Sequence, residues 1–309
     1  MSMRVAVVGV GHLGKHHARI LASLPEVDLV AVADTNQARA DEIAAANHTR
    51  SVYSAHELIG QVDAVSIAVP TEQHLAVALP FLNAGVAVLV EKPMARSLDE
   101  ADLMIAAAAS AGVALAVGHT ERFNPAVEAA RHMLRDPRFI EVHRLGTFPE
   151  RSLDIDVVFD LMIHDLDVVL SLVASEVESI EAVGVPVLTG RVDIANARLR
   201  FENGCIANLT ASRISRDRVR KIRFFQPAGY LSIDYGAQKV EMYRLVKGAG
   251  PMPSIEGGDM PVTNEEPLKR ELVDFIDAVS SKRPPLVDGA QGRRALALAT
   301  AITSRMASI

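Results

Sequence analysis

The stretch Val5-Ala6-Val7-Val8-Gly9-Val10-Gly11-His12-Leu13-Gly14, which leads into a helical pattern, decides the fold of the first part of the chain. A short apolar run of this kind is typical of a buried parallel strand, and the three glycines permit a tight turn and close backbone approach. The helix that follows presents N–H groups and its positive dipole end to a pyrophosphate. The pattern predicts a dinucleotide site that includes Gly9, Gly11, His12, Leu13 and Gly14.

Asp34 supports this interpretation because it follows a second apolar strand, Leu29 to Ala33, twenty residues after Gly14. A carboxylate at this place accepts a hydrogen bond from an adenosine ribose 2′-hydroxyl and repels a 2′-phosphate. The residue therefore favours NAD over NADP as the cofactor. An alternative is that Asp34 is the N-cap of the next helix, and the two roles can coexist.

Composition sets the class of protein. With 309 residues, of which 49% are apolar, the chain can bury a sizeable core in two domains. A net charge of −6 and dispersed lysines and arginines leave no broad basic surface, so we expect neither nucleic-acid nor membrane partners. A single cysteine, Cys205, excludes an internal disulfide framework and is consistent with a cytoplasmic protein. We expect no signal peptide, since the first apolar run is itself the strand that leads into the glycine turn. We expect no membrane span, since the alanine-rich stretch from 101 to 117 is too weakly apolar.

Up to about residue 120, short apolar runs alternate with helical patterns, which predicts a doubly wound parallel sheet of the Rossmann type. The expected strands are 4–8, 28–33, 64–69, 87–90 and 114–117. Ser97 and Glu100 form a capping box that opens an alanine-rich helix, and Gly112 stands where that helix should end.

From about residue 137 the segments are longer and strand-like, which predicts an α+β domain with a large, mostly antiparallel open sheet. Asn203-Gly204 marks a hairpin turn, and one helix is expected over about 157–173. We interpret residues 248–267, rich in glycine and proline, as a surface loop, followed by helices over about 265–281 and 289–308. The predicted domains are 1–121, which binds NAD, and 122–309, which binds substrate and forms the oligomer.

Glu91-Lys92-Pro93 follows an apolar strand at the sheet edge where open α/β folds bind ligands. Beside a nicotinamide, the Lys92 amine can donate to a substrate oxygen and stabilise an alkoxide as hydride leaves its carbon. The alternative is an exposed, solvated pair of charges in a loop.

Asp160 and His164 lie four residues apart in a helical pattern and therefore share one face. A carboxylate can orient an imidazole, and an imidazole suits a general base that removes a hydroxyl proton. By spacing alone, a structural polar pair explains them equally well. A metal site lacks an identifiable third ligand, so we predict no metal.

Together with Val69-Pro70-Thr71, His74 and Gly118-His119, these motifs resemble the Gfo/Idh/MocA oxidoreductase family over nearly the whole chain. The resemblance implies an NAD-dependent oxidoreductase acting on CH–OH groups, with Lys92, His164 and Asp160 as catalytic residues. It places Pro70, His74 and Glu91 along the nicotinamide riboside. It also implies a homodimer or homotetramer formed through the outer face of the C-terminal sheet.

The runs from Gly118 to Pro125 and from Phe159 to Asp167 resemble members that oxidise the 3-hydroxyl of nucleotide-linked amino sugars, such as UDP-N-acetylglucosamine. A UDP-sugar is therefore the expected substrate. A sugar diphosphate needs cations and amides around it. The candidates for substrate contact are His119, Arg122, Asn124, Arg151, Arg213 and Arg216.

Two other functions stay open. One is oxidation of a free sugar or an inositol-like polyol. The other is a non-catalytic nicotinamide-binding regulator, since a nucleotide site does not guarantee chemistry. The joint presence of Lys92, Asp160 and His164 argues against the regulator.

Overall fold

The computed structural model describes residues 2–148, 155–246 and 254–306. The chain divides into two compact units, each with its own sheet: unit 1 comprises residues 1–120 and 268–296, and unit 2 comprises residues 121–267 and 297–309. Prediction placed all of 122–309 in the second domain, and this is wrong for the segment 268–296. We describe each unit by itself.

The sheet of unit 1 has six parallel strands in the order β3-β2-β1-β4-β5-β6. Their bounds are Met3–Val8 (β1), Val27–Ala33 (β2), Arg50–Val52 (β3), Ala64–Ile67 (β4), Ala87–Glu91 (β5) and Leu115–Gly118 (β6). This order places the switch point between β1 and β4, and ligands of such sheets bind at the carboxyl ends of the strands there. The doubly wound parallel sheet is confirmed, and the three-residue strand β3 is an addition to it.

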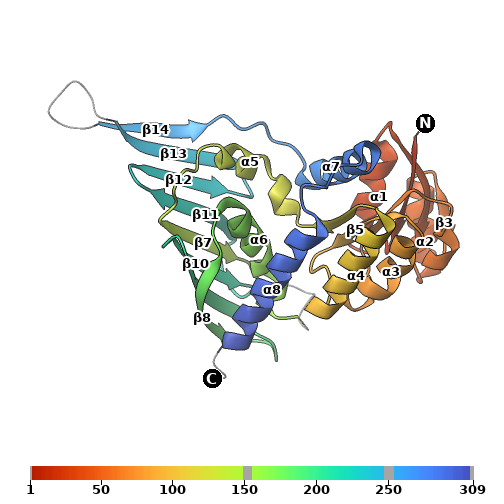
Figure 1. Ribbon diagram of the computed structural model, residues 1–309, viewed down its shortest axis with the longest axis horizontal. Helices are drawn as coiled ribbons and strands as arrows, with labels where there is room; N and C mark the ends of the chain where they lie inside the picture. Colours follow the sequence, from red (N-terminus) through yellow and green to blue (C-terminus); the bar gives the residue numbers. More distant parts are fainter. Residues whose placement is uncertain (1, 149–154, 247–253, 307–309) are drawn as a thin grey trace. The chain divides into compact units, whose positions relative to one another are not determined.

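Helices cover both faces of this sheet (Figure 1). They are α1 (Gly14–Ser23), α2 (Gln37–Ala46), α3 (His74–Asn83) and α4 (Leu98–Ala111), with short 3-10 turns η1 (Ala55–Leu58) and η2 (Thr71–Gln73). The predicted ends of α4 are confirmed: the Ser97 hydroxyl accepts from the Glu100 amide at 3.2 Å, and Gly112 ends the helix in the left-handed region at φ 66°. The Glu100 carboxylate reaches back to the amide of Arg96, one residue earlier than a capping box requires.

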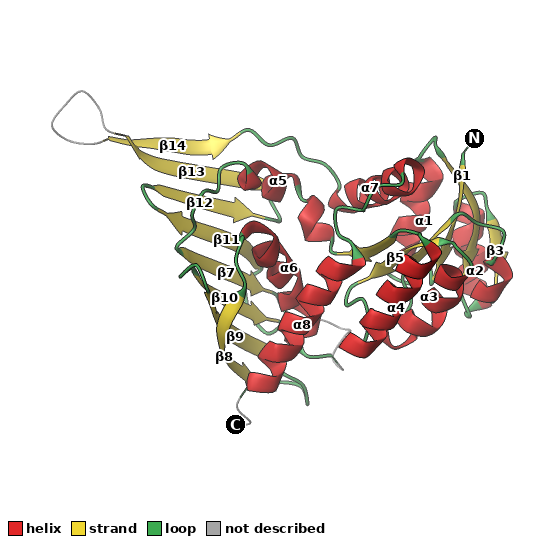
Figure 2. Ribbon diagram, viewed as in Figure 1, coloured by secondary structure: helices red, strands yellow, loops and turns green. Residues whose placement is uncertain are grey.

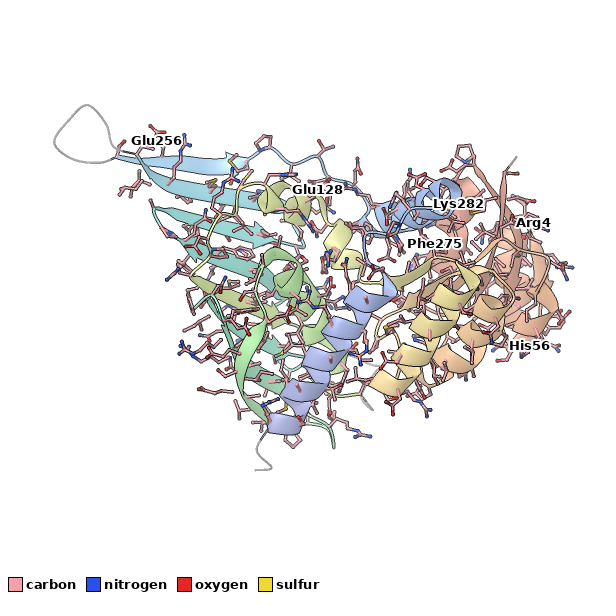
Figure 3. All side chains as sticks on the ribbon, in the orientation of Figure 1. Arg4, His56, Glu128, Glu256, Phe275 and Lys282 are labelled. Carbon is pink, nitrogen blue, oxygen red and sulfur yellow. The ribbon has the colours of Figure 1, made fainter. Side chains whose placement is uncertain are left out.

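Two C-terminal helices, α7 (Pro267–Ser281) and α8 (Gly289–Arg305), explain the revised boundary. Leu272, Phe275 and Ile276 of α7 join the same core cluster as β1 and α1, and Figure 3 labels Phe275. At the start of α8, a Cβ on Gly292 would lie 2.5 Å from the Val117 side chain, so the helix packs very close to β6. Apolar residues of α7 and of the start of α8 therefore pack within unit 1. Local sequence patterns do not reveal this long-range packing.

The sheet of unit 2 has eight strands in the order β14-β13-β12-β11-β7-β10-β9-β8. Their bounds are Phe139–Leu145 (β7), Val177–Val185 (β8), Ile194–Phe201 (β9), Ile206–Ser212 (β10), Val219–Gln226 (β11), Gly229–Asp234 (β12), Lys239–Val246 (β13) and Ser254–Met260 (β14). All pairs are antiparallel except β7 with β10. The predicted Asn203-Gly204 hairpin joins β9 to β10, with Gly204 at φ +81°.

Strand β14 corrects the prediction of a loop over 248–267. It pairs antiparallel with β13 from Ser254 to Met260. At Gly257, whose φ is +150°, a Cβ would lie 1.9 Å from the Met242 carbonyl oxygen, so only glycine permits this approach. Gly257 and Gly258, which suggested a loop, therefore belong to strand β14.

One face of the second sheet is covered by α5 (Pro125–Arg131) and α6 (Ile163–Leu172), as Figure 2 shows. The short turn η3 (Thr120–Phe123) precedes α5, and the π-helical turn η4 (Val158–Met162) precedes α6. Along β9, buried residues alternate with the exposed Asn196, Arg198 and Arg200, so this strand turns polar side chains to the opposite face. No helix in the described ranges has the length and apolarity needed to cross a membrane.

Candidate active site

The glycine turn fits a dinucleotide. Gly9 has φ +83° and lies so near the Ala68 backbone that a Cβ would approach it to 2.8 Å. A Cβ on Gly14 would lie 1.8 Å from the Gly9 carbonyl oxygen, whereas one on Gly11 would meet nothing nearer than 3.8 Å. Gly11 therefore leaves open space in an otherwise closed turn. Leu13 stands at the N-cap of α1 without a side-chain capping hydrogen bond, and the positive end of a helix dipole favours an anionic ligand at such a place.

Asp34 lies at the end of β2 and braces this turn. Its Oδ2 accepts from the Val10 amide at 3.0 Å, and its Oδ1 accepts from the Asn36 amide at 2.9 Å. The N-cap of α2 is Asn36, whose side chain accepts from the Arg39 amide, so the alternative N-cap role for Asp34 is wrong. Each carboxylate oxygen retains a further lone pair for a ribose hydroxyl.

Lys92 is half-buried and directly follows β5, at the carboxyl edge of the parallel sheet. The Lys92–Pro93 peptide bond is cis. Among the residues implied to line the nicotinamide riboside, Pro70 is exposed, whereas His74 and Glu91 are buried. The ring nitrogens of His74 lie 3.0 Å from the Pro93 carbonyl oxygen and 2.9 Å from that of Val69. His74 therefore ties the segment after β4 to the segment after Lys92.

Glu91 is held by residues that sequence reasoning missed. His17 Nε2 lies 3.1 Å from Glu91 Oε1, and His17 Nδ1 lies 2.7 Å from the Ser66 hydroxyl. Burial alone would raise the pKa of Glu91, but the hydrogen bond and charge of His17, together with Lys92, hold it below its usual value. The one available signal was a histidine one turn into a helix that the glycine pattern had already predicted.

In unit 2, Asp160 and His164 are both half-buried and belong to neighbouring elements. Asp160 lies in the π-helical turn η4, and His164 is the second residue of α6. The predicted single α-helix over 157–173 therefore begins with a π turn, in which the Ile163 amide bonds to the Val158 carbonyl. Such turns are rare and occur frequently at functional sites.

The residue after His164 is fixed by a buried arginine. Arg144 of β7 binds Asp165 through Nε at 2.6 Å and Nη2 at 3.0 Å, and its Nη1 lies 3.1 Å from Glu121 Oε1. Its guanidinium carbon lies 5.2 Å from the centre of the Tyr235 ring. Burial would lower the pKa of Arg144, but the two carboxylates raise it. The start of α6 is thus tied to the sheet by a bidentate ion pair.

The candidates for substrate contact have different surroundings. Arg122 is buried and pairs with Asp167 at 3.2 Å, and the buried Asn124 donates to the Tyr235 carbonyl oxygen and caps α5. His119 is buried in unit 1, and Arg216 is exposed. Arg151 lies outside the described residues. As substrate contacts, all of these stay predictions.

Arg213, the remaining candidate, is buried beside Asp193, with its Nε 3.2 Å from the Asp193 carboxylate. Asp193 also accepts from the amides of Val187, Leu188 and Thr189, at 2.7 to 2.9 Å. Burial would raise the pKa of Asp193, but these amides and the Thr189 hydroxyl lower it to about 2. Arg213 also donates to the carbonyl oxygens of Ile155 and Val192, so this cluster fixes the approach to η4.

A search of the described residues finds no group of three or more histidine, cysteine, aspartate or glutamate side chains able to hold a metal ion. The candidate residues of the two sites supply an amine, an imidazole and carboxylates. These groups can hold and move protons, and the glycine turn can hold an anionic cofactor.

Comparison with known proteins identifies the family. Residues 3–119 match the oxidoreductase family with an NAD-binding Rossmann fold, and residues 128–231 match the Gfo/Idh/MocA C-terminal domain. The chain is 42% identical over 301 residues to the UDP-N-acetylglucosamine 3-dehydrogenase of Acidithiobacillus ferrooxidans, covering 96% of this chain and 95% of that protein. A solved structure of that dehydrogenase matches with a TM-score of 0.94 at 40% identity, over 99% of this chain and 98% of the other.

More distant relatives share the same architecture. The myo-inositol 2-dehydrogenase of Thermotoga maritima is 27% identical, over 96% of this chain and 94% of its own. A levoglucosan dehydrogenase solved with NADH and levoglucosan has a TM-score of 0.89 at 19% identity, over 99% and 97% of the two chains, which shows the fold alone. The chain belongs to the Gfo/Idh/MocA family of NAD-binding oxidoreductases.

Proposed function

We propose that this protein oxidises the 3-hydroxyl of a nucleotide-linked amino sugar, with UDP-N-acetylglucosamine as the first substrate to test. The observation that carries this proposal is the 42% identity, over nearly the whole of both chains, to a UDP-N-acetylglucosamine 3-dehydrogenase. The candidate residues in both units have the chemistry that such an oxidation needs.

His164 is the proposed general base, and it takes the proton of the hydroxyl that is oxidised. Asp160 orients its imidazole and stabilises the charge that it gains. Lys92 donates to the substrate oxygen and holds the negative charge that develops there. NAD, when bound at the glycine turn and Asp34, supplies the hydride acceptor.

Substrate contact beyond the reacting hydroxyl is proposed for the remaining polar candidates. Arg216 is exposed and can meet a diphosphate directly. The buried candidates would act mainly by positioning the groups around the substrate. They are His119, Arg122, Asn124 and Arg213, and Arg151 is carried forward from the sequence.

A substrate panel tests the proposal. With NAD in excess, NADH formation is followed by absorbance for UDP-N-acetylglucosamine, UDP-glucose, free N-acetylglucosamine and myo-inositol. We expect the first to have the highest kcat/KM, by at least about 10²-fold over the free sugar, because the diphosphate adds charge-assisted hydrogen bonds. Equal or faster turnover of the free sugar or the polyol would overturn the substrate assignment.

The relative from Thermotoga maritima makes inositol oxidation the second candidate activity. Turnover of myo-inositol without turnover of UDP-sugars would establish it. NAD binding with no reduction by any member of the panel would instead indicate a regulator. A cytoplasmic location stays a prediction.

We also propose that the chain forms a homodimer or homotetramer through the open face of the second sheet. Four aromatic rings cross adjacent strands there, with centroids 5.6, 5.3 and 6.2 Å apart in the series Phe139, Phe225, Tyr230 and Tyr243. Phe225 and Tyr243 are 37% and 39% exposed. An exposed aromatic row of this kind is typical of a protein interface.

Light scattering after size exclusion tests this assembly. The wild type should have the mass of a dimer or tetramer, and Phe225→Glu should shift it to a monomer because a charge enters an apolar contact. Leu188→Glu, at an exposed residue between β8 and β9, is the control and should leave the mass unchanged. A monomeric wild type at micromolar concentration would contradict the proposal.

A further inference from the structure

Glu91 is a buried carboxylate whose neighbours lie on α1, on β6 and at the adjacent residue Lys92. Its Oε1 accepts a hydrogen bond from Nε2 of His17 on α1, at 3.1 Å. Its Oε2 accepts a hydrogen bond from the backbone amide of Lys92, at 3.2 Å. On the neighbouring strand β6, a Cβ at Gly118 would lie 3.1 Å from the Glu91 carboxylate, so glycine leaves the room that this side chain occupies. The Glu91 side chain is only 8% exposed.

Both ring nitrogens of His17 have a partner within hydrogen-bond distance. His17 and Ser66 are both 0% exposed, and the Ser66 hydroxyl from β4 lies 2.7 Å from Nδ1. A neutral imidazole has one donor and one acceptor nitrogen, and a carboxylate can only accept. Nε2 is therefore the donor to Glu91, while the Ser66 hydroxyl can donate to Nδ1 or accept from it. This set of Ser66, His17 and Glu91 is called the buried relay below.

A buried polar set of this kind is weak evidence for a role in stability. Replacing a buried polar or charged set by apolar side chains of similar volume is often neutral or stabilising, because desolvation offsets the attraction. What the relay does provide is a fixed acceptor for one backbone amide, that of Lys92. That amide sets the direction in which the chain, and with it the Lys92 side chain, leaves β5.

We propose that His17 is a positioning residue for Lys92, acting through Glu91. His17 holds Oε1 of Glu91 and thereby keeps Oε2 of the same carboxylate on the Lys92 amide. The Lys92 side chain, with its amine, then leaves the strand in one direction. This rests on the proposed function, in which Lys92 is the group that touches substrate. His17 lies three residues after Gly14, so the helix that begins at the glycine turn is linked to Lys92 by two successive hydrogen bonds.

The first test reads the Lys92 amide directly, in the absence of cofactor. Hydrogen exchange followed by NMR, on the assigned backbone amide signal of Lys92, reports this one amide directly. In His17→Leu, exchange should be at least about 10-fold faster than in the wild type, because Glu91 loses the donor that holds it. His17→Gln retains a donor at a similar reach and should restore most of the protection.

Kinetics provide the second readout. His17→Leu should lower kcat by about 10- to 100-fold, since small displacements of a catalytic group are costly, while KM for NAD stays within about 3-fold. Leu21→Ala is the matched control: Leu21 is a fully buried residue one turn further along α1. It should lower Tm but leave kcat and the exchange of the Lys92 amide unchanged.

The outcomes separate this inference from the proposed function. If folded His17→Leu keeps wild-type kcat and Lys92 protection, or if Leu21→Ala lowers kcat as much, His17 is not a positioning residue. If His17→Leu does not fold, Glu91→Gln takes its place, and unchanged exchange of the Lys92 amide would overturn the inference. If Lys92→Met turns over normally, the proposed function fails, whatever the exchange shows.

Discussion

Glu91 in unit 1 and Asp165 in unit 2 are both buried carboxylates, and each is adjacent in sequence to a proposed catalytic residue. Asp165 is bound by both arms of Arg144, a cation that stays charged at every pH at which the protein is folded. Glu91 is bound by His17 through a single hydrogen bond. The comparison indicates two ways of bracing a catalytic residue through its neighbour: a permanent ion pair for His164 and a hydrogen-bonded relay for Lys92.

The largest loss of activity is expected at Lys92, the proposed catalytic residue next to Glu91. Lys92→Met should lower kcat by about 10³-fold or more, because the developing oxyanion loses its charged donor. NAD affinity, measured by calorimetry, should change by less than about 3-fold, because the amine meets the substrate rather than the nucleotide. Lys269→Met, an exposed change on α7, is the control with unaltered kcat. A Lys92→Met enzyme with normal kcat would remove Lys92 from the mechanism.

The substitution Arg144→Met removes the ion pair that holds Asp165. Two carboxylates, Asp165 and Glu121, then lose their common cation in the interior, and the free energy of unfolding should fall by about 3–5 kcal/mol. Arg223→Met is the matched control on β11, since its partner Glu141 is 2.7 Å away but 31% exposed. There the loss should be at most about 1 kcal/mol, as for surface pairs.

Urea unfolding of both variants measures this difference. Adding Asp165→Asn to Arg144→Met should recover part of the loss, because the unpaired charge is gone. Equal destabilisation by Arg144→Met and Arg223→Met would contradict the structural role given to the buried pair.

Asp193 is a third buried carboxylate to set beside Glu91 and Asp165. Its main hydrogen-bond donors are backbone amides. Its folded pKa of about 2 lies below the usual value of 3.8, so its contribution is present above about pH 4 and is lost as the pH falls towards 2. In Asp193→Asn we expect a lower Tm at pH 7, with a loss of roughly 2 kcal/mol. The difference in Tm from the wild type should narrow between pH 5 and pH 3. A constant difference over that range would show that ionisation is not the cause.

The smallest effect is expected at Asp34, whose carboxylate is 10% exposed and is held by two amides alone at hydrogen-bond distance. Asp34→Ser removes the repulsion of a 2′-phosphate while Arg39 lies nearby. The ratio of kcat/KM for NAD to that for NADP should fall by about 10-fold, which corresponds to about 1.4 kcal/mol. An unchanged ratio would mean that Asp34 acts only on the glycine turn.

Local patterns predicted the parts of the fold that have local causes. Alternating apolar runs indicated the parallel sheet of unit 1, and Asn203-Gly204 indicated the hairpin between β9 and β10 in the second sheet. Ser97 and Gly112 marked the ends of α4. Strand ends and spacing drew attention to Lys92, Asp160 and His164, and the family resemblance made them catalytic candidates. Strand β14 was missed because its glycines serve a close approach to β13.

The rest depends on contacts between residues that are far apart in sequence. His17 and Glu91 are 74 residues apart, and Arg144 and Asp165 are 21 apart. No periodicity records such pairs. The packing of α7 on the first sheet, which joins residues 272–276 to a core formed near the N-terminus, has the same origin.

The central claim is that Lys92 and His164 act on one hydroxyl group, and a double-mutant cycle in kcat tests it most directly. Lys92→Arg and His164→Gln are mild enough to leave measurable rates. Residues that act as a unit show losses that do not multiply, so the double variant should be within about 10-fold of the slower single variant. Losses that multiply fully would mean that the two side chains act independently, and would contradict the account.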